Sequence, residues 1–347
     1  MKKLLLILLI SCSGSMAWAQ RDYDMPYLTK SMAGQNINEV EATTSGGDVS
    51  VESVSAGQEK IEVFIWPSNR KKGATVSKED IQKILDELYD LTVEVAGNKL
   101  TATAKPKHKN MNWKSALSIS FKIFTGKNIA AHLTTSGGNI GLTAITGDQR
   151  ITTSGGNISI DNVKGKVKGV TSSGNIDVKD SDEDLDLVTS GGNIEASHCS
   201  GKVALSTSGG NVIMVNLDGI IKATTSGGDV RANDIKGDLN AHTSGGNIDM
   251  AGLACNLITA TSGGDIKVVI TTADKYVKIS NSGGKIELQL PAGKGYDMDL
   301  SADKIKTGTM SNFSGDMDDK KIQGQLNGGG TEVKVNGGGG KLVLTFN

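Results

Sequence analysis

The chain of 347 residues has few of the side chains that fill an ordinary globular core or equip an active site. Aromatic residues make up 4% of it, and it contains four prolines, three cysteines and four histidines. So few aromatic residues argue against a large globular core. A net charge of −1 gives no electrostatic basis for binding nucleic acid. Glycine is abundant instead: 45 residues recur at fixed offsets, as repeated tight turns require.

The scarce cysteines and histidines predict neither a disulfide nor a metal cofactor. Cys199 and Cys255 lie three repeats apart, which at about 4.8 Å per repeat is about 14 Å. A disulfide needs Cα atoms within about 7 Å, so we expect two small, buried apolar side chains. None of the four histidines has a metal-type partner three or four residues away: His108, His132, His198 and His242.

The N-terminus has the pattern of an export signal. Two lysines precede the apolar run Leu4–Ile10, and a small-residue tail ends at Ala19, which predicts a signal peptide over 1–19. A second interpretation stays open, because the residues before Cys12 fit a lipoprotein cleavage box that would leave Cys12 acylated. No later stretch approaches 18 apolar residues, so the sequence predicts no transmembrane span.

One six-residue phrase dominates the region 134–284. TSGGNI stands at 135–140, 153–158, 189–194 and 243–248, and near-copies fill the positions between and after them. The steps between copies are 18 residues until the last, which is 20. A fixed period over this length is typical of a solenoid, in which one unit stacks on copies of itself.

Within each 18-residue coil, apolar residues alternate with polar ones on both sides of the phrase. Ile158 and Ile160 after one copy, and Val167 before the next, illustrate the pattern. A second glycine usually follows ten residues after the first glycine of the phrase, as Gly165 follows Gly155. We therefore predict an all-β solenoid of two short strands and two glycine turns per coil, with regular repeats over 134–300.

The flanks of the repeats depart from this pattern. Residues 20–36 form a polar leader, and 37–133 carry N-terminal strands with an insertion. In this insertion Ser77 and the spacing of Ile81, Leu85 and their neighbours predict one amphipathic helix over 78–89, capping the open end of the stack. Strands are expected at 91–104, with a turn at 97–98, and at 117–124. Within 301–347, two glycine-flanked strands, 331–335 and 341–346, are expected to be the closing coils.

One acidic turn and two columns of polar residues are candidates for chemistry. An acidic turn replaces glycine in one coil and is a weak candidate for a cation, a solvated turn being the preferred interpretation: Asp180, Asp182, Glu183 and Asp184. A column of Asn, such as Asn157, predicts a stacked amide ladder rather than calcium ligands. A column of Thr is a candidate for binding ice or a crystal face, which we disfavour because a flat array would need its neighbouring column, which is mixed: Thr135, Thr153, Thr171, Thr189, Thr207, Thr225, Thr243 and Thr261.

The repeats behind an export signal resemble a family of exported bacterial β-strand-repeat proteins, the "putative adhesin" domains of unknown function. The resemblance covers nearly the whole exported chain, including TTSGGDVSVES at 43–53 and the glycine-rich end. It implies a right-handed β-solenoid in the cell envelope. It supplies no functional residues that can be matched to this chain.

The leading hypothesis is therefore a non-enzymatic, secreted or envelope-bound solenoid, adhesin-like or scaffolding, without a cofactor. It would sit in the periplasm, at the outer membrane or outside the cell, and contact an unknown protein or polysaccharide. One alternative is a module that binds a polysaccharide or senses an envelope signal, because solenoid flanks present extended surfaces. A less favoured one is a polysaccharide-acting enzyme, with carboxylates drawn from Asp161, Asp177, Glu195 and Asp249.

Overall fold

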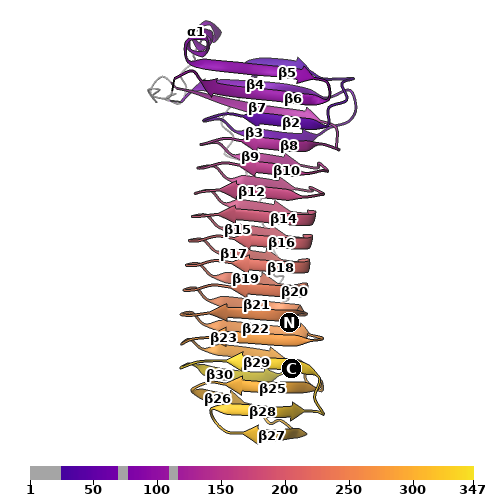
Figure 1. Cartoon of the computed structure of the whole chain (residues 1–347), viewed down its shortest axis with the longest axis vertical. Coiled ribbons are helices and arrows are strands. Elements are labelled where there is room, and N and C mark those ends of the chain that lie inside the picture. Colours follow the sequence, from indigo (N-terminus) through magenta and orange to yellow (C-terminus); the bar gives the residue numbers. More distant parts are fainter. Residues whose placement is uncertain (1–24, 69–76, 109–115) are drawn as a thin grey trace, which may run out of the picture.

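The protein is a long stack of β-coils. The computed structural model describes residues 25–68, 77–108 and 116–347, and within them it contains thirty strands and one helix. Figure 1 shows a single elongated rod with the helix at one end. The predicted all-β solenoid is confirmed. The predicted signal peptide and the Cys12 alternative lie outside the described residues.

Each regular coil contributes one strand to each of two faces. Strands that precede the TSGG turn form the first face: β8 (Ala130–Thr134), β10 (Gln149–Thr152), β12 (Val167–Thr171), β14 (Asp182–Thr189), β16 (Ser200–Ser206), β18 (Asp218–Thr224), β20 (Lys236–His242) and β23 (Tyr276–Asn281). Strands that follow it form the second face: β9 (Ile140–Thr143), β11 (Ile158–Asp161), β13 (Ile176–Lys179), β15 (Ile194–Ser197), β17 (Val212–Val215), β19 (Val230–Asn233), β22 (Ile266–Thr272) and β24 (Ile286–Leu290). β21 (Ile248–Thr261) runs through both faces.

The pairing along each face is parallel and in register. Ile158 faces Ile176, which faces Ile194, so each residue lies beside its equivalent 18 positions later. The same offset joins Leu185 to Val203 on the first face. Because the side chains of a strand alternate between its two sides, this constant offset stacks apolar residues on apolar residues along the whole rod.

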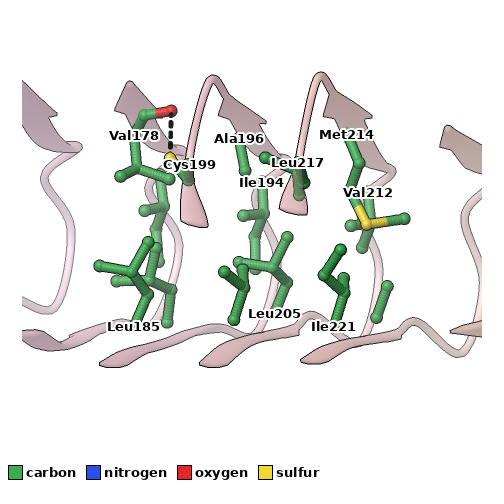
Figure 2. Close-up of a cluster of buried hydrophobic side chains, with 14 of the residues drawn as sticks. Val178, Leu185, Ile194, Ala196, Cys199, Leu205, Val212, Met214, Leu217 and Ile221 are labelled. Atoms are coloured by element: carbon green, nitrogen blue, oxygen red, sulfur yellow. Dashed lines mark hydrogen bonds between the residues drawn. The ribbon is translucent and has the colours of Figure 1, made fainter. Parts of the chain in front are cut away.

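The core is the space between the two faces. In Figure 2, Ile194 and Val212 from the second face and Leu185, Leu205 and Ile221 from the first point into the same interior. All five are at most 2% exposed. Burying a side chain of this size contributes about 1.5–3 kcal/mol, but a lone coil would leave its apolar edges open. The stack is therefore the stable unit.

The two turns of each coil need glycine for different reasons. At the second turn, Gly165 and Gly219 have φ of +110° and +133°, as expected for left-handed positions. The glycines of the TSGG phrase are absent from the positive-φ residues of the described chain, so a left-handed backbone does not explain them. A Cβ on Gly210 would lie 2.0 Å from the carbonyl oxygen of Gly192 in the preceding coil. Close approach between coils is what excludes a side chain.

A further left-handed corner opens the second turn, and no sequence motif predicts it. Its residues have φ between +51° and +59° and share only their place in the coil: Ala144, Asn162, Asp180, His198, Asn216 and Asp234. Asn and Asp tolerate this conformation well. The column therefore reflects the path of the chain rather than one preferred residue.

At the N-terminal end the order of the strands in the stack differs from their order in the sequence. β2 (Glu39–Thr43) and β3 (Val49–Ser53) lie between β8/β9 and the outer strands β6 (Lys99–Pro106) and β7 (Leu117–Thr125). β5 (Tyr89–Ala96) forms a hairpin with β6, and β4 (Lys60–Pro67) pairs antiparallel with β7. β1 (Leu28–Ser31) pairs with β4. The predicted strands and the turn at 97–98 are confirmed.

The predicted helix is confirmed as α1 (Lys78–Leu88). The Ser77 side chain accepts a hydrogen bond from the backbone N–H of Asp80, the standard capping contact at a helix start. Ile81 and Leu85 are buried, and the helix ends where Tyr89 becomes extended. Figure 1 places α1 at the end of the rod beside β4 and β5.

The prediction that the last two strands form the closing coils is wrong, because other strands lie beyond them at the C-terminal end. The outermost strands are β25 (Tyr296–Ser301), β26 (Lys304–Thr307), β27 (Phe313–Met317) and β28 (Lys321–Leu326). The last two strands, β29 (Thr331–Asn336) and β30 (Lys341–Phe346), lie one coil further in. β29 pairs with β23 and β25, and β30 pairs with β24 and β26.

Candidate functional site

The threonine column lies inside the rod. Its eight members are at most 4% exposed. Each hydroxyl donates to a backbone carbonyl of the preceding coil at 2.7–2.9 Å and accepts a glycine N–H of its own turn at 3.2–3.4 Å. These hydroxyls cannot meet ice or another surface. They fasten one coil to the next.

The asparagine column is a ladder of a different kind from the predicted one. The Oδ1 atom of Asn157 accepts the backbone N–H of Asn175 at 2.8 Å, and the contact repeats from coil to coil. The partner is the main chain rather than a second amide. A carboxylate can accept the same bond, which explains why Asp229 takes an Asn place, accepting from Asn247 at 2.9 Å. Calcium ligation is not needed to explain the column.

The exposed rim of the TSGG turn is the most regular surface of the rod. We call it the Ser-Gly edge, and its serines are exposed: Ser136, Ser154, Ser172, Ser190, Ser208, Ser226, Ser244, Ser262 and Ser282. Their backbone groups are bonded, for example Ser208 N–H to the Ser190 carbonyl at 3.2 Å. Hydroxyl groups are therefore presented at the strand spacing of about 4.8 Å.

The acidic turn is where the regular surface breaks. Asp182 accepts a hydrogen bond from Ser200 at 2.8 Å and lies 3.7 Å from the Lys164 ammonium. Asp180 lies 3.8 Å from His198 in the next coil. In the described part of the chain, no three His, Cys, Asp or Glu side chains are arranged to hold a metal ion. The four residues of the weak cation candidate thus do not converge.

A basic coil lies directly beside this acidic one. Residues 172–189 carry six carboxylates and one lysine, whereas 154–171 carry three lysines and one aspartate. Lys168 of the basic coil lies 3.8 Å from Asp186 of the acidic coil. Conversely, Lys179 of the acidic coil lies 3.1 Å from Asp161 of the basic coil. Exposed pairs of this kind contribute about 0–1 kcal/mol each. The acidic coil is balanced by its neighbour, in agreement with a solvated turn.

Glu183 adopts a backbone conformation that its neighbours reserve for glycine. It lies in register with Gly201, and its φ is +89°. Non-glycine residues rarely adopt this region and are strained there by about 1–3 kcal/mol. Its side chain is exposed, so the strain is not offset by burial.

Three of the four carboxylates considered for sugar chemistry come together. Asp177 faces Glu195 across neighbouring strands, and Asp161 lies on the preceding coil. Burial raises the pKa of Asp177, Asp161 adds to this, and Lys179 opposes it. Asp249 lies further along the rod in the coil beside Arg231. Lys179 pairs with Asp161 at 3.1 Å, so this carboxylate is already engaged in an ion pair.

The cysteines and the buried polar side chain Gln149 have structural explanations. Cys199 and Cys255 are buried free thiols, as predicted, and burial raises their pKa to about 11 and about 12. Gln149, polar at an apolar position, donates to the Ile129 carbonyl at 2.7 Å and accepts the Ala131 N–H at 3.0 Å. Neither thiol is ionised near neutral pH, which leaves both unreactive.

No helix in the described part of the chain combines the length and apolar character needed to cross a bilayer.

No family model and no curated protein matches the sequence. Solved structures that are similar to it include two bacterial proteins. A "putative cell adhesion protein" from Clostridium sporogenes shares 10% identity, with a TM-score of 0.21, covering 92% of this chain and 98% of its own. A "putative adhesin" from Bacteroides fragilis shares 14% identity, with a TM-score of 0.23, covering 92% and 96%.

Both names agree with the family that the sequence resembles. TM-scores of this size do not carry a conclusion about function, so the assignment has to come from the surface of the rod itself.

Proposed function

We propose that the protein is an exported, non-enzymatic β-solenoid of the bacterial cell envelope that works by surface contact, as an adhesin-like or scaffolding rod. The observation that carries this proposal is the Ser-Gly edge, which repeats the same exposed group in coil after coil. A catalytic group would occur once. A repeated group offers many equal, weak contacts along one line, which together give strong attachment to an extended partner.

The chemistry of the remaining surface supports the same conclusion. Asp182 and Asp186 of the acidic coil have lysine partners, and the two cysteines are buried. Asp161, which adds to the raised pKa of Asp177, is paired with Lys179. These contacts describe a solvated, charge-balanced rod rather than a reaction centre.

Binding of a polysaccharide is the second candidate. Rows of hydroxyl groups at strand spacing can donate to and accept from the hydroxyls of an extended glycan, and solenoid faces suit such ligands. The Ser-Gly edge offers this pattern over nine coils.

The experiment that tests the proposal is a binding screen on the purified exported chain, using a glycan array, extracellular matrix proteins and isolated envelopes. Saturable binding to a protein surface supports adhesion, and binding confined to glycans supports the second candidate. Turnover of an envelope polysaccharide that Asp177→Asn abolishes would overturn both. The mass of the mature N-terminus distinguishes cleavage after Ala19 from acylation at Cys12.

A further inference from the structure

The order of strands at the C-terminal end differs from their order in the sequence. On the first face the order is β23, β29, β25, and on the second it is β24, β30, β26. The chain therefore passes from β24 to β25 and leaves one coil position vacant. Residues 331–346, which we call the tail coil, later fill that position between strands that already flank it.

The tail coil is a full copy of the repeating unit. Its offset from the coil beneath it is constant, from Tyr276 opposite Glu332 to Leu290 opposite Phe346. The two glycine turns also stack, because a Cβ on Gly340 would lie 2.0 Å from the Gly284 carbonyl oxygen. Its four inward side chains are at most 1% exposed: Val333, Val335, Leu342 and Leu344.

The coil beyond the tail coil is not a regular one. Between Ser301 and Lys304 it has two residues, where the tail coil has four between Asn336 and Lys341. It lacks the glycine turn and is followed by the β27–β28 hairpin, which pairs antiparallel with β25. The tail coil therefore occupies a slot one coil wide near the end of the rod. Parallel strand partners lie on both sides of this slot.

A glycine hinge joins the tail coil to the strand before it. Asn327, Gly328, Gly329 and Gly330 have φ of +49°, +83°, +84° and +154°. Three consecutive glycines have the greatest backbone freedom available to a chain. The hinge reverses direction over β25, because Leu326 and Thr331 face Tyr296 from its opposite sides.

We propose that the tail coil is exchangeable between copies of this chain, so that two rods join at their C-terminal ends with each tail coil in the other's slot. The occupant is a second copy because the slot matches this sequence in register, in its glycine turn and in its four apolar positions. Exchange of an identical element through a hinge recreates every native contact and leaves little energetic difference between closed and exchanged forms. The inference is independent of the contact function proposed above.

A cross-linking experiment distinguishes the two forms. Lys278 and Lys334 face each other on adjacent strands with exposed side chains, at a spacing of about 5 Å that suits a disulfide. All variants carry Cys12→Ser in the full chain. Lys278→Cys and Lys334→Cys copies are unfolded together, refolded at high concentration and oxidised. We expect a covalent dimer, well above the control pair of Lys278→Cys with Lys222→Cys. A yield equal to that of the control would overturn the proposal.

Shortening the hinge gives a second, independent test. Leu326 and Thr331 are separated by two strand spacings, about 10 Å. Deletion of 328–330 leaves two Cα steps, which span at most about 7 Å. The tail coil can then no longer close on its own copy. We expect light scattering to report a folded dimer, whereas a folded monomer would overturn the proposal, as would a chain that remains unfolded at every concentration.

Discussion

The hydroxyl of Thr207 donates a 2.8 Å hydrogen bond to the carbonyl oxygen of Gly192, one coil earlier. It also accepts the N–H of Gly210 in its own turn at 3.2 Å. One buried oxygen thereby satisfies a backbone acceptor and a backbone donor that no water can reach. Because the contact repeats along the rod, the TSGG phrase is a fastening between coils rather than a binding motif.

Replacing Thr207 by valine removes this oxygen while keeping the shape of the side chain. Two buried backbone groups lose their partner, at about 1–3 kcal/mol each, so we expect the free energy of unfolding to fall by about 2–6 kcal/mol. Thr207→Ser keeps the oxygen and loses a methyl group, about 1 kcal/mol. Chemical denaturation of both variants provides the comparison, and equal losses would show that the hydroxyl is not the fastening.

The two glycines of one turn should respond differently to the same substitution. Gly210→Ala places a methyl group 2.0 Å from the Gly192 carbonyl oxygen and should destabilise the rod by about 3 kcal/mol or more. Gly209→Ala meets nothing closer than 3.7 Å and should change stability by about 0.5 kcal/mol or less. Ser173 already occupies the equivalent of Gly209 in another coil. The melting temperatures of Gly210→Ala and Gly209→Ala test this prediction. Similar values would contradict a close approach between Gly210 and the preceding coil.

Glu183 offers a stabilising substitution. Its φ of +89° strains the backbone at Glu183, whereas glycine adopts this conformation without strain. Glu183→Gly should therefore raise the free energy of unfolding by about 1 kcal/mol, once the greater freedom of glycine in the unfolded chain is included. Glu183→Ala removes the charge but keeps the Cβ, and should gain much less. An equal gain from both would assign the effect to charge rather than to backbone strain.

Asp177 should make stability depend on pH. Burial raises its pKa above the usual 3.8, with Asp161 adding to the effect and Lys179 opposing it. The folded chain then holds this proton at pH values where the unfolded chain has lost it, so the contribution of Asp177 falls as pH rises through that window. Asp177→Asn should raise the melting temperature at pH 7 and leave it nearly unchanged near pH 3. A loss of stability at pH 7 would show that the carboxylate is favoured in the fold.

Particular residues show what the sequence could predict. The 18-residue period fixes the coils, and the alternation of Val203, Leu205 and Thr207 also indicates that the threonine points inward. The helix was visible from Ser77 and its apolar spacing. The left-handed corner was not, because Ala144, Asp180 and His198 share no chemistry.

The position of the tail coil in the stack could not be predicted from the sequence. Its strands were recognisable from their alternation and glycines, but their place in the stack was not. A coil stacks equally well on any coil of the same pattern, so the sequence identifies the unit without its neighbours. The shortened turn after Ser301, which ends the regular pattern, is the feature that sets the order.

The proposed function requires the rod to make contact along its repeated surface and not at one site. Deleting 208–225 removes one whole coil, joins Thr207 to Ser226 and preserves the register. Binding to isolated envelopes is then measured for chains lacking one and two coils, with circular dichroism confirming that each is folded. We predict an affinity that falls stepwise with each coil removed. Unchanged affinity in both folded chains would contradict the claim and place the contact at an end of the rod.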